Sequence, residues 1–223
     1  MKWSIGLFLM ITTRLFSQSS ETMHTYSYLA LGDSYTIGEA LNLQHSFPYQ
    51  AVSLLREKGI SFYAPEIIAK TGWTTDELDA ALRDHVFLPK YDFVSLLIGV
   101  NNQYRGRDII EYKEQFEELL KRAITLANGK KEHVMVISIP DYGVTPFAAA
   151  KDPERIAREI DTFNTVNRAI SVQYKVHYID ITPGSRKAKA DPSLIAEDGL
   201  HPSKNEYANW AESLVELISR QLK

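Results

Sequence analysis

The stretch of sequence that decides the fold is residues 26–38, which read YSYLALGDSYTIG. Its first part, 26–32, is almost continuously apolar, as expected of a strand that is covered on both faces in a parallel sheet. Gly32 then allows the backbone to turn, and Ser34 follows at the carboxyl end of the predicted strand. The stretch therefore predicts a buried strand with a serine at the rim of the sheet.

The same alternation of short apolar runs and longer amphipathic segments continues along the chain. Five apolar runs predict strands, and five segments with apolar residues every three to four positions predict helices. The predicted strands are 26–32, 65–69, 93–99, 134–139 and 176–181, and the predicted helices are 47–58, 74–86, 109–128, 153–174 and 205–222. This alternation favours right-handed crossovers, and so predicts the α/β class: a three-layer α/β/α sandwich with a five-stranded parallel sheet. Functional residues are expected outside the carboxyl ends of its strands.

The composition is that of one ordinary globular domain. The 223 residues include 25 Lys and Arg against 28 Asp and Glu, and 44% are apolar. A net charge of -3 provides no basic field for phosphate backbones, so no nucleic-acid partner is expected. The absence of cysteine excludes disulfides, thiolate zinc sites and cysteine nucleophiles. No H-E-x-x-H motif or similar cluster occurs, so neither a metal nor a cofactor is expected.

The N-terminus has the pattern of a signal peptide. Lys2 gives a positive start, and the apolar run over 3–13 is shorter than the roughly 20 residues that span a bilayer. We expect a signal peptide over 1–20, a single domain over 21–223, export to the periplasm or the outside, and no stable membrane span. Because Arg14 directly follows the apolar run, an uncleaved amphipathic start or a buried helix is the alternative.

Ser34 is the first candidate for chemistry, because its position at a strand end suits a nucleophile. A helix N-cap or an anion-binding turn would use the same serine. The G-x-S-x-G elbow is absent, since Thr36 occupies its second glycine position, and no phosphate-binding glycine loop occurs. A nucleophilic serine at this place therefore needs a base from elsewhere in the chain.

His201 is the candidate base. It alone among the six histidines lies three residues after an aspartate, Asp198, just before the last predicted helix. Such a carboxylate can accept the Nδ1 proton and leave Nε2 free to take a proton from a serine. A capping aspartate beside a surface histidine is the alternative. The other histidines are expected to be structural: His24, His45, His85, His133 and His177.

Two further strand ends offer hydrogen-bond donors for the charge that develops on an acyl oxygen. Asn101 follows the third predicted strand, and Gly72 follows the second, before a helix that Thr74 can cap. Taken singly, Asn101 also fits a bond within its own loop, and Gly72 also fits a simple turn.

Together these segments resemble the SGNH hydrolases, also called the GDSL esterase and lipase family. The four blocks of that family carry a serine, a glycine, an asparagine and a histidine, and Ser34, Gly72, Asn101 and His201 follow in that order. The resemblance implies a flavodoxin-like SGNH hydrolase fold and a serine esterase, with Ser34 as nucleophile, His201 as general base and then acid, and Asp198 orienting His201. It also implies an oxyanion hole formed by the backbone N–H groups of Ser34 and Gly72 and the Asn101 side chain.

The resemblance covers residues 26–210, with two departures from the pattern of the family. Tyr35 stands where the family name has leucine, and Asn102 stands where an aspartate commonly follows the asparagine. Two loops are expected to shape the pocket: Tyr142 and Phe147 could line an acyl slot, and Arg105 could face an anionic headgroup. All three fit solvent-facing loop residues equally well.

The substrate stays open at this point. A small-molecule carboxylic ester of the lipase, lysophospholipase or arylesterase type is expected, with carbohydrate acetyl esters and acyl thioesters as alternatives. Two non-catalytic readings keep the fold: an exported glycan- or peptide-binding module, and a flavodoxin-like nucleotide binder. Neither needs Asp198 or His201, so the presence of both residues favours the esterase.

Overall fold

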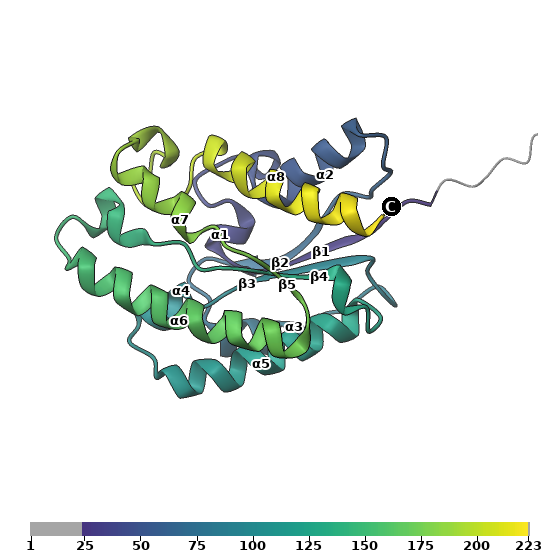
Figure 1. Cartoon of the computed structure of the whole chain (residues 1–223), viewed down its shortest axis with the longest axis horizontal. Coiled ribbons are helices and arrows are strands. Elements are labelled where there is room, and N and C mark those ends of the chain that lie inside the picture. The colour runs from purple at the N-terminus through teal and green to yellow at the C-terminus, as the bar shows by residue number, and fades with distance from the viewer. Residues whose placement is uncertain (1–23, 223) are drawn as a thin grey trace, which may run out of the picture.

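Five parallel strands form the central sheet, in the order β2-β1-β3-β4-β5 (Figure 1). The computed structural model describes residues 24–222, so the expected signal peptide over 1–20 lies outside the described residues. The strands are β1 (Tyr28–Asp33), β2 (Glu66–Lys70), β3 (Phe93–Leu97), β4 (Val134–Ile137) and β5 (His177–Ile179). Each coincides with a predicted strand to within about two residues at either end.

Helices cover both faces of this sheet, which confirms the predicted α/β/α sandwich. Figure 1 shows α2 and α8 on one face and α3, α5 and α6 on the other. The helices are α1 (Ser34–Ile37), α2 (Phe47–Glu57), α3 (Thr75–Asp84), α4 (Val100–Tyr104), α5 (Ile109–Leu126), α6 (Pro153–Tyr174), α7 (Thr182–Ser185) and α8 (Lys204–Gln221). The short helices α1, α4 and α7 have no counterpart among the predicted ones, because a single turn is too short to show a periodic pattern.

The strand order opens a crevice between β1 and β3. The chain passes from β1 outward to β2 and then returns to β3 on the other side of β1. In this flavodoxin-like order, the connections leave the two central strands in opposite directions, and ligands bind at that switch point. Helix α1 begins directly after β1, and α4 begins shortly after β3, so both start at the mouth of the crevice.

Close packing fixes the turn from β1 into α1. Strands β1 and β3 are buried along their whole length, and the Tyr28 hydroxyl and the Ser95 hydroxyl hydrogen-bond across them at 2.7 Å. A Cβ atom at Gly32 would overlap both the Thr36 side chain and the carbonyl oxygen of Leu97. Glycine is therefore required there for α1 to pack against the end of β3.

Helix α8 packs on α2 through an aromatic cluster. The Trp210 ring lies 6.0 Å from that of Phe47 and 5.1 Å from that of Tyr207, centroid to centroid. The indole N–H of Trp210 donates to the buried Glu206 carboxylate at 2.9 Å. Among residues 24–222, no helix combines the length and the apolar character that a membrane span requires.

Candidate active site

Ser34 is the first residue of α1, and a short cap holds it there. The Asp33 side chain accepts the N–H of Tyr35 at 3.0 Å, and Gly38 ends the helix in the left-handed conformation. Only 5% of the Ser34 surface is exposed. The turn thus places one nearly buried hydroxyl at the carboxyl end of β1.

The aspartate beside this serine has a raised pKa. Asp33 is fully buried, and this burial raises its pKa to about 7, although the hydrogen bond from the Tyr35 N–H acts in the opposite direction. Its Oδ2 atom has no hydrogen-bond partner among the described residues. Near neutral pH, a large fraction of Asp33 is therefore uncharged.

Asp198 and His201 lie in the loop before α8 and are hydrogen-bonded to each other. The Asp198 carboxylate accepts the backbone N–H groups of Leu200 and His201, both at 3.0 Å, and its Oδ2 lies 2.5 Å from His201 Nδ1. Burial opposes the charged form of Asp198, but the hydrogen bonds from His201 and Leu200 together outweigh it and lower the pKa of this carboxyl. Asp198 is therefore a carboxylate at neutral pH and holds the Nδ1 side of the ring.

A pocket of about 110 Å³ brings the serine and the histidine together from opposite ends of the chain. Its lining residues are Ser34, Tyr35, Val100, Asn101, Tyr104, Tyr142, Phe147, Leu200 and His201. Within the described part of the chain, Ser34 Oγ makes no hydrogen bond to His201 Nε2. Such contacts are often loose before substrate binds, so a shared pocket with a free Nε2 still suits proton transfer.

Asn101 and Gly72 lie at the two turns beside this pocket. The Asn101 amide donates one hydrogen bond to the carbonyl oxygen of Trp73 at 3.0 Å, which leaves its second N–H available. Gly72 has a φ of 84°, a conformation that favours glycine. Asn101 lines the pocket, whereas Gly72 is not among the lining residues and is connected to Asn101 through its neighbour Trp73.

Arg105 connects three elements beside the pocket. Its guanidinium donates to the carbonyl oxygen of Gly72 at 2.6 Å and to Glu77 at 3.3 Å. These bonds tie α4 to the Gly72 turn and to α3. The pairing with Glu77 could not be predicted, because Glu77 lies far away in the sequence, and the contact with an anionic headgroup stays a prediction.

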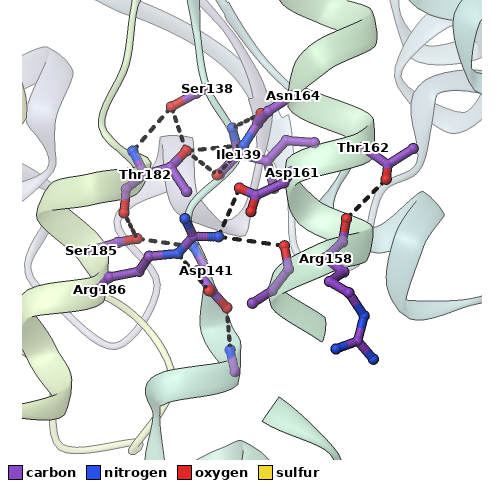
Figure 2. A network of polar contacts seen from close by, with 12 residues as sticks. Ser138, Ile139, Asp141, Arg158, Asp161, Thr162, Asn164, Thr182, Ser185 and Arg186 are labelled. Carbon is purple, nitrogen blue, oxygen red and sulfur yellow. Dashed lines mark hydrogen bonds and ion pairs between the residues drawn. The ribbon is translucent and has the colours of Figure 1, made fainter. Parts of the chain in front are cut away.

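The loop after β4 carries two pocket walls, Tyr142 and Phe147, as predicted. A polar network anchors it (Figure 2). The buried Asp141 carboxylate accepts Arg186 Nε at 2.8 Å, and the same guanidinium reaches Asp161 at 2.8 Å. The other end of this loop is tied to the loop that carries Asp198 and His201, because the Phe147 N–H donates to the Gly199 carbonyl at 2.9 Å. The pocket walls are thus fixed to the loop that carries Asp198 and His201 and to α6.

Two contacts at the site have no clear sequence signal. The Tyr35 ring lies 5.0 Å from the His201 ring, centroid to centroid, and Tyr35 is almost completely buried. The Asn102 amide bonds both the backbone N–H and the hydroxyl of Thr75, at 3.1 and 2.7 Å. The only signal was position: each residue directly follows a candidate site residue and departs from the pattern of the family.

The remaining histidines serve structural roles where bonds are seen. His85 pairs with Glu66 at 2.7 Å, and His133 bonds the carbonyl oxygen of Asp92 at 2.6 Å. Among residues 24–222, no group of three or more His, Asp or Glu side chains could hold a metal ion.

Comparisons with known proteins identify the family of the chain. Residues 30–208 match the model of the GDSL-like lipase/acylhydrolase family. An acetylxylan esterase of Geobacillus stearothermophilus is 27% identical over 185 residues, which are 79% of this chain and 77% of that protein.

Solved structures share the fold. Axe2, an acetylxylan esterase from Geobacillus stearothermophilus, superposes with a TM-score of 0.68 at 19% identity over 88% of this chain and 95% of its own. A lipase/acylhydrolase from Enterococcus faecalis gives a TM-score of 0.68 at 21% identity over 88% of this chain and 97% of its own. At these identities the likeness supports the architecture alone.

Proposed function

Because this chain belongs to the GDSL-like lipase/acylhydrolase family and is a carboxylic ester hydrolase, we propose that it cleaves its ester through Ser34, His201 and Asp198. The observation that carries the proposal is the shared pocket of Ser34 and His201, with Asp198 2.5 Å from the far nitrogen of the imidazole. A binding module would need no such arrangement.

In this mechanism the Ser34 hydroxyl attacks the acyl carbon while His201 Nε2 takes its proton. The imidazolium that forms is stabilised by the Asp198 carboxylate. His201 then gives the proton to the departing alcohol, and an acyl ester of Ser34 remains. Water, deprotonated by the same imidazole, hydrolyses this ester and releases the acid.

The negative charge on the acyl oxygen needs donors in fixed positions. We assign this role to the backbone N–H groups of Ser34 and Gly72 and to the free N–H of the Asn101 amide. The bond from Asn101 to Trp73 supports the assignment, because it restrains the amide beside the turn that carries Gly72. Loss of one such donor typically slows the chemical step by roughly a hundredfold to a thousandfold.

The direct test is Ser34→Ala. We expect it to abolish hydrolysis of p-nitrophenyl acetate and labelling by a fluorophosphonate probe, because both reactions need the serine hydroxyl. The circular dichroism spectrum should match that of the wild type, since a buried methyl group fits where the hydroxyl was. Retention of both turnover and labelling by the variant would refute the nucleophile.

The pocket favours esters with a short acyl group. Its volume is about 110 Å³, and the aromatic side chains of Tyr104, Tyr142 and Phe147 line it. The lysophospholipase-like alternative would require room for a long chain. A comparison of p-nitrophenyl acetate with p-nitrophenyl palmitate measures this preference, and faster turnover of the palmitate would reverse it.

A second, narrower candidate is a carbohydrate O-acetylesterase. It is favoured by the 27% identity to an acetylxylan esterase over 79% of this chain. Release of acetate from acetylated xylan, compared with p-nitrophenyl acetate, would test it.

Export of the enzyme is proposed from the sequence alone. The positive start and short apolar run within 1–20 are typical of a signal peptide that precedes the catalytic domain over 21–223. After cleavage of this signal peptide, the secreted or periplasmic form lacks its first residues, and N-terminal sequencing of the purified protein measures this. A cytoplasmic protein with an intact N-terminus would contradict export.

A further inference from the structure

A second, larger cleft adjoins the catalytic pocket. Its volume is about 610 Å³, and it shares two lining residues, Tyr104 and Tyr142, with the pocket. It lies between α4 and the start of α6, where the loop after β4 enters that helix. An ester bound at Ser34 therefore has a route by which one of its two sides can extend into this cleft.

Two aromatic side chains lie where the cleft meets the catalytic pocket: Tyr104 lines both, and Phe147 lines the pocket alone. The rings of Tyr104 and Phe147 lie 6.0 Å apart, and 48% and 43% of these residues are exposed, which is high for side chains of this size. The Lys151 ammonium lies over both rings, 4.8 Å from the Tyr104 centroid and 5.4 Å from that of Phe147. Lys151 thus covers part of these rings, and the part of each ring that stays exposed can contact the C–H groups of a ligand.

The rest of the cleft is polar and of mixed charge. The buried Gln103 side chain donates from Nε2 to Glu159 Oε2 at 2.6 Å, which joins α4 to α6. Glu159 also lies 4.0 Å from the Arg155 guanidinium, and Asp152 and Lys151 complete the wall. Donors and acceptors alternate here without an excess of either charge.

We propose that this cleft is the subsite for the alcohol side of the ester and that this alcohol is a sugar ring. The inference rests on the proposed function. A pyranose presents an apolar C–H face that can stack on the exposed ring of Tyr104, and its hydroxyls both donate to Glu159 and accept from Arg155 and Lys151. The acyl group stays in the smaller, more apolar pocket beside Ser34.

Other occupants fit this cleft less well. A long acyl chain would remove Glu159, Arg155 and Lys151 from water without offering them any new hydrogen bond, which is costly. A phosphate headgroup would gain from Lys151 and Arg155 but would meet the carboxylates of Glu159 and Asp152. A neutral ligand rich in hydroxyls satisfies both kinds of charged group.

The test compares two acetate esters on the same enzyme. One is an acetylated methyl pyranoside, whose alcohol part has further free hydroxyls, and the other is p-nitrophenyl acetate, whose alcohol part has none beyond the esterified oxygen. We expect Arg155→Ala and Lys151→Ala each to lower kcat/KM for the pyranoside by about tenfold, mainly through KM, and to affect p-nitrophenyl acetate much less. Arg158→Ala is the matched control, because Arg158 lies on α6 outside the cleft and pairs with Glu154. It should change neither rate.

The sugar subsite and ester hydrolysis at Ser34 can be refuted separately. Equal losses on both esters, or no loss on the pyranoside, would overturn the sugar subsite while ester hydrolysis at Ser34 stands. A wild-type enzyme that hydrolyses no ester would instead refute the proposed function. Thermal unfolding of each variant separates either result from a folding defect. Arg155→Lys, which keeps the positive charge, should retain part of the kcat/KM that Arg155→Ala loses.

Discussion

At the scale of single residues, the imidazole of His201 is held from two sides. Asp198 bonds its Nδ1, and the buried ring of Tyr35 packs against it 5.0 Å away, centroid to centroid. Tyr35 in turn lies 6.4 Å from Trp210. A leucine at position 35 would be smaller and not planar, so the tyrosine gives this ring a support that the aliphatic residue would not provide.

Tyr35 should therefore act as a positioning residue for His201. We expect Tyr35→Ala to lower kcat by about tenfold or more, because a misplaced ring transfers protons less well. Tyr35→Phe should restore most of the rate, since it keeps the ring. The measurement is the pH profile of kcat/KM for p-nitrophenyl acetate: a shifted profile in the alanine variant alone supports positioning, and identical profiles for all three enzymes would contradict it.

Asp33 should make the stability of the protein depend on pH. Its pKa is about 7 in the folded state against an ordinary value of 3.8, so between these values the folded state keeps a proton that the unfolded chain releases. Stability from this group is therefore greatest at acidic pH and falls as the pH rises from about 4 to about 7, by up to roughly 4 kcal/mol.

The matched variant is Asp33→Asn, which is neutral at every pH and can still accept the Tyr35 N–H. Its melting temperature relative to that of the wild type should increase as the pH is raised from 4 to 8. Differential scanning calorimetry of both proteins measures this. Curves that stay parallel across the range would show that Asp33 does not titrate differently on folding.

At the scale of elements, α4 holds Asn101 and is itself held by its neighbours. The Asn102 side chain bonds the N-terminus of α3 through Thr75, and Gln103 bonds α6 through Glu159. Because α4 is only five residues long, these side-chain bonds, more than its own backbone bonds, keep it in place. The asparagine at 102 thus supports Asn101 where the family commonly has an aspartate.

Removal of that support should affect both stability and rate. Asn102→Ala removes the acceptor of the Thr75 N–H and the donor to the Thr75 hydroxyl. We expect it to lower the free energy of unfolding by about 1–3 kcal/mol. It should also reduce kcat more than it changes KM, because Asn101 moves with α4. Urea unfolding and steady-state kinetics measure the two effects, and a variant as stable and as fast as the wild type would rule out this support.

At the scale of the whole molecule, the packing of α8 on α2 connects the core to the site. Trp210 contacts Phe47 on α2 and Tyr35 beside Ser34, and α8 follows directly after the loop of Asp198 and His201. His201 is therefore positioned by a helix that lies on a different face of the sheet from α4 and Asn101 (Figure 1).

Loss of this packing should destabilise the fold. We expect Trp210→Ala to cost about 3–5 kcal/mol, since it empties a fully buried site and leaves Glu206 without its indole partner. Val172→Ala, at a position 68% exposed on α6, is the control and should stay within about 0.5 kcal/mol. Chemical unfolding measures both, and similar values for the two would contradict the role of the cluster.

The sequence by itself determined the elements and the local part of the site. Buried strands and amphipathic helices repeat with regular periods, so β1 to β5 and the five long helices could be predicted to within a few residues. The bond between Asp198 and His201 could also be predicted, because three residues in one loop keep the two side chains in reach.

Only the tertiary structure decided which distant side chains meet. The strand order, the contact of Tyr35 with His201, the use of Arg105 to hold the Gly72 turn and the Gln103–Glu159 bond that builds the cleft all join residues from different elements. Their physical reason is packing: a side chain finds its partner according to how the helices and loops dock on the sheet, and no periodicity along the chain records that choice.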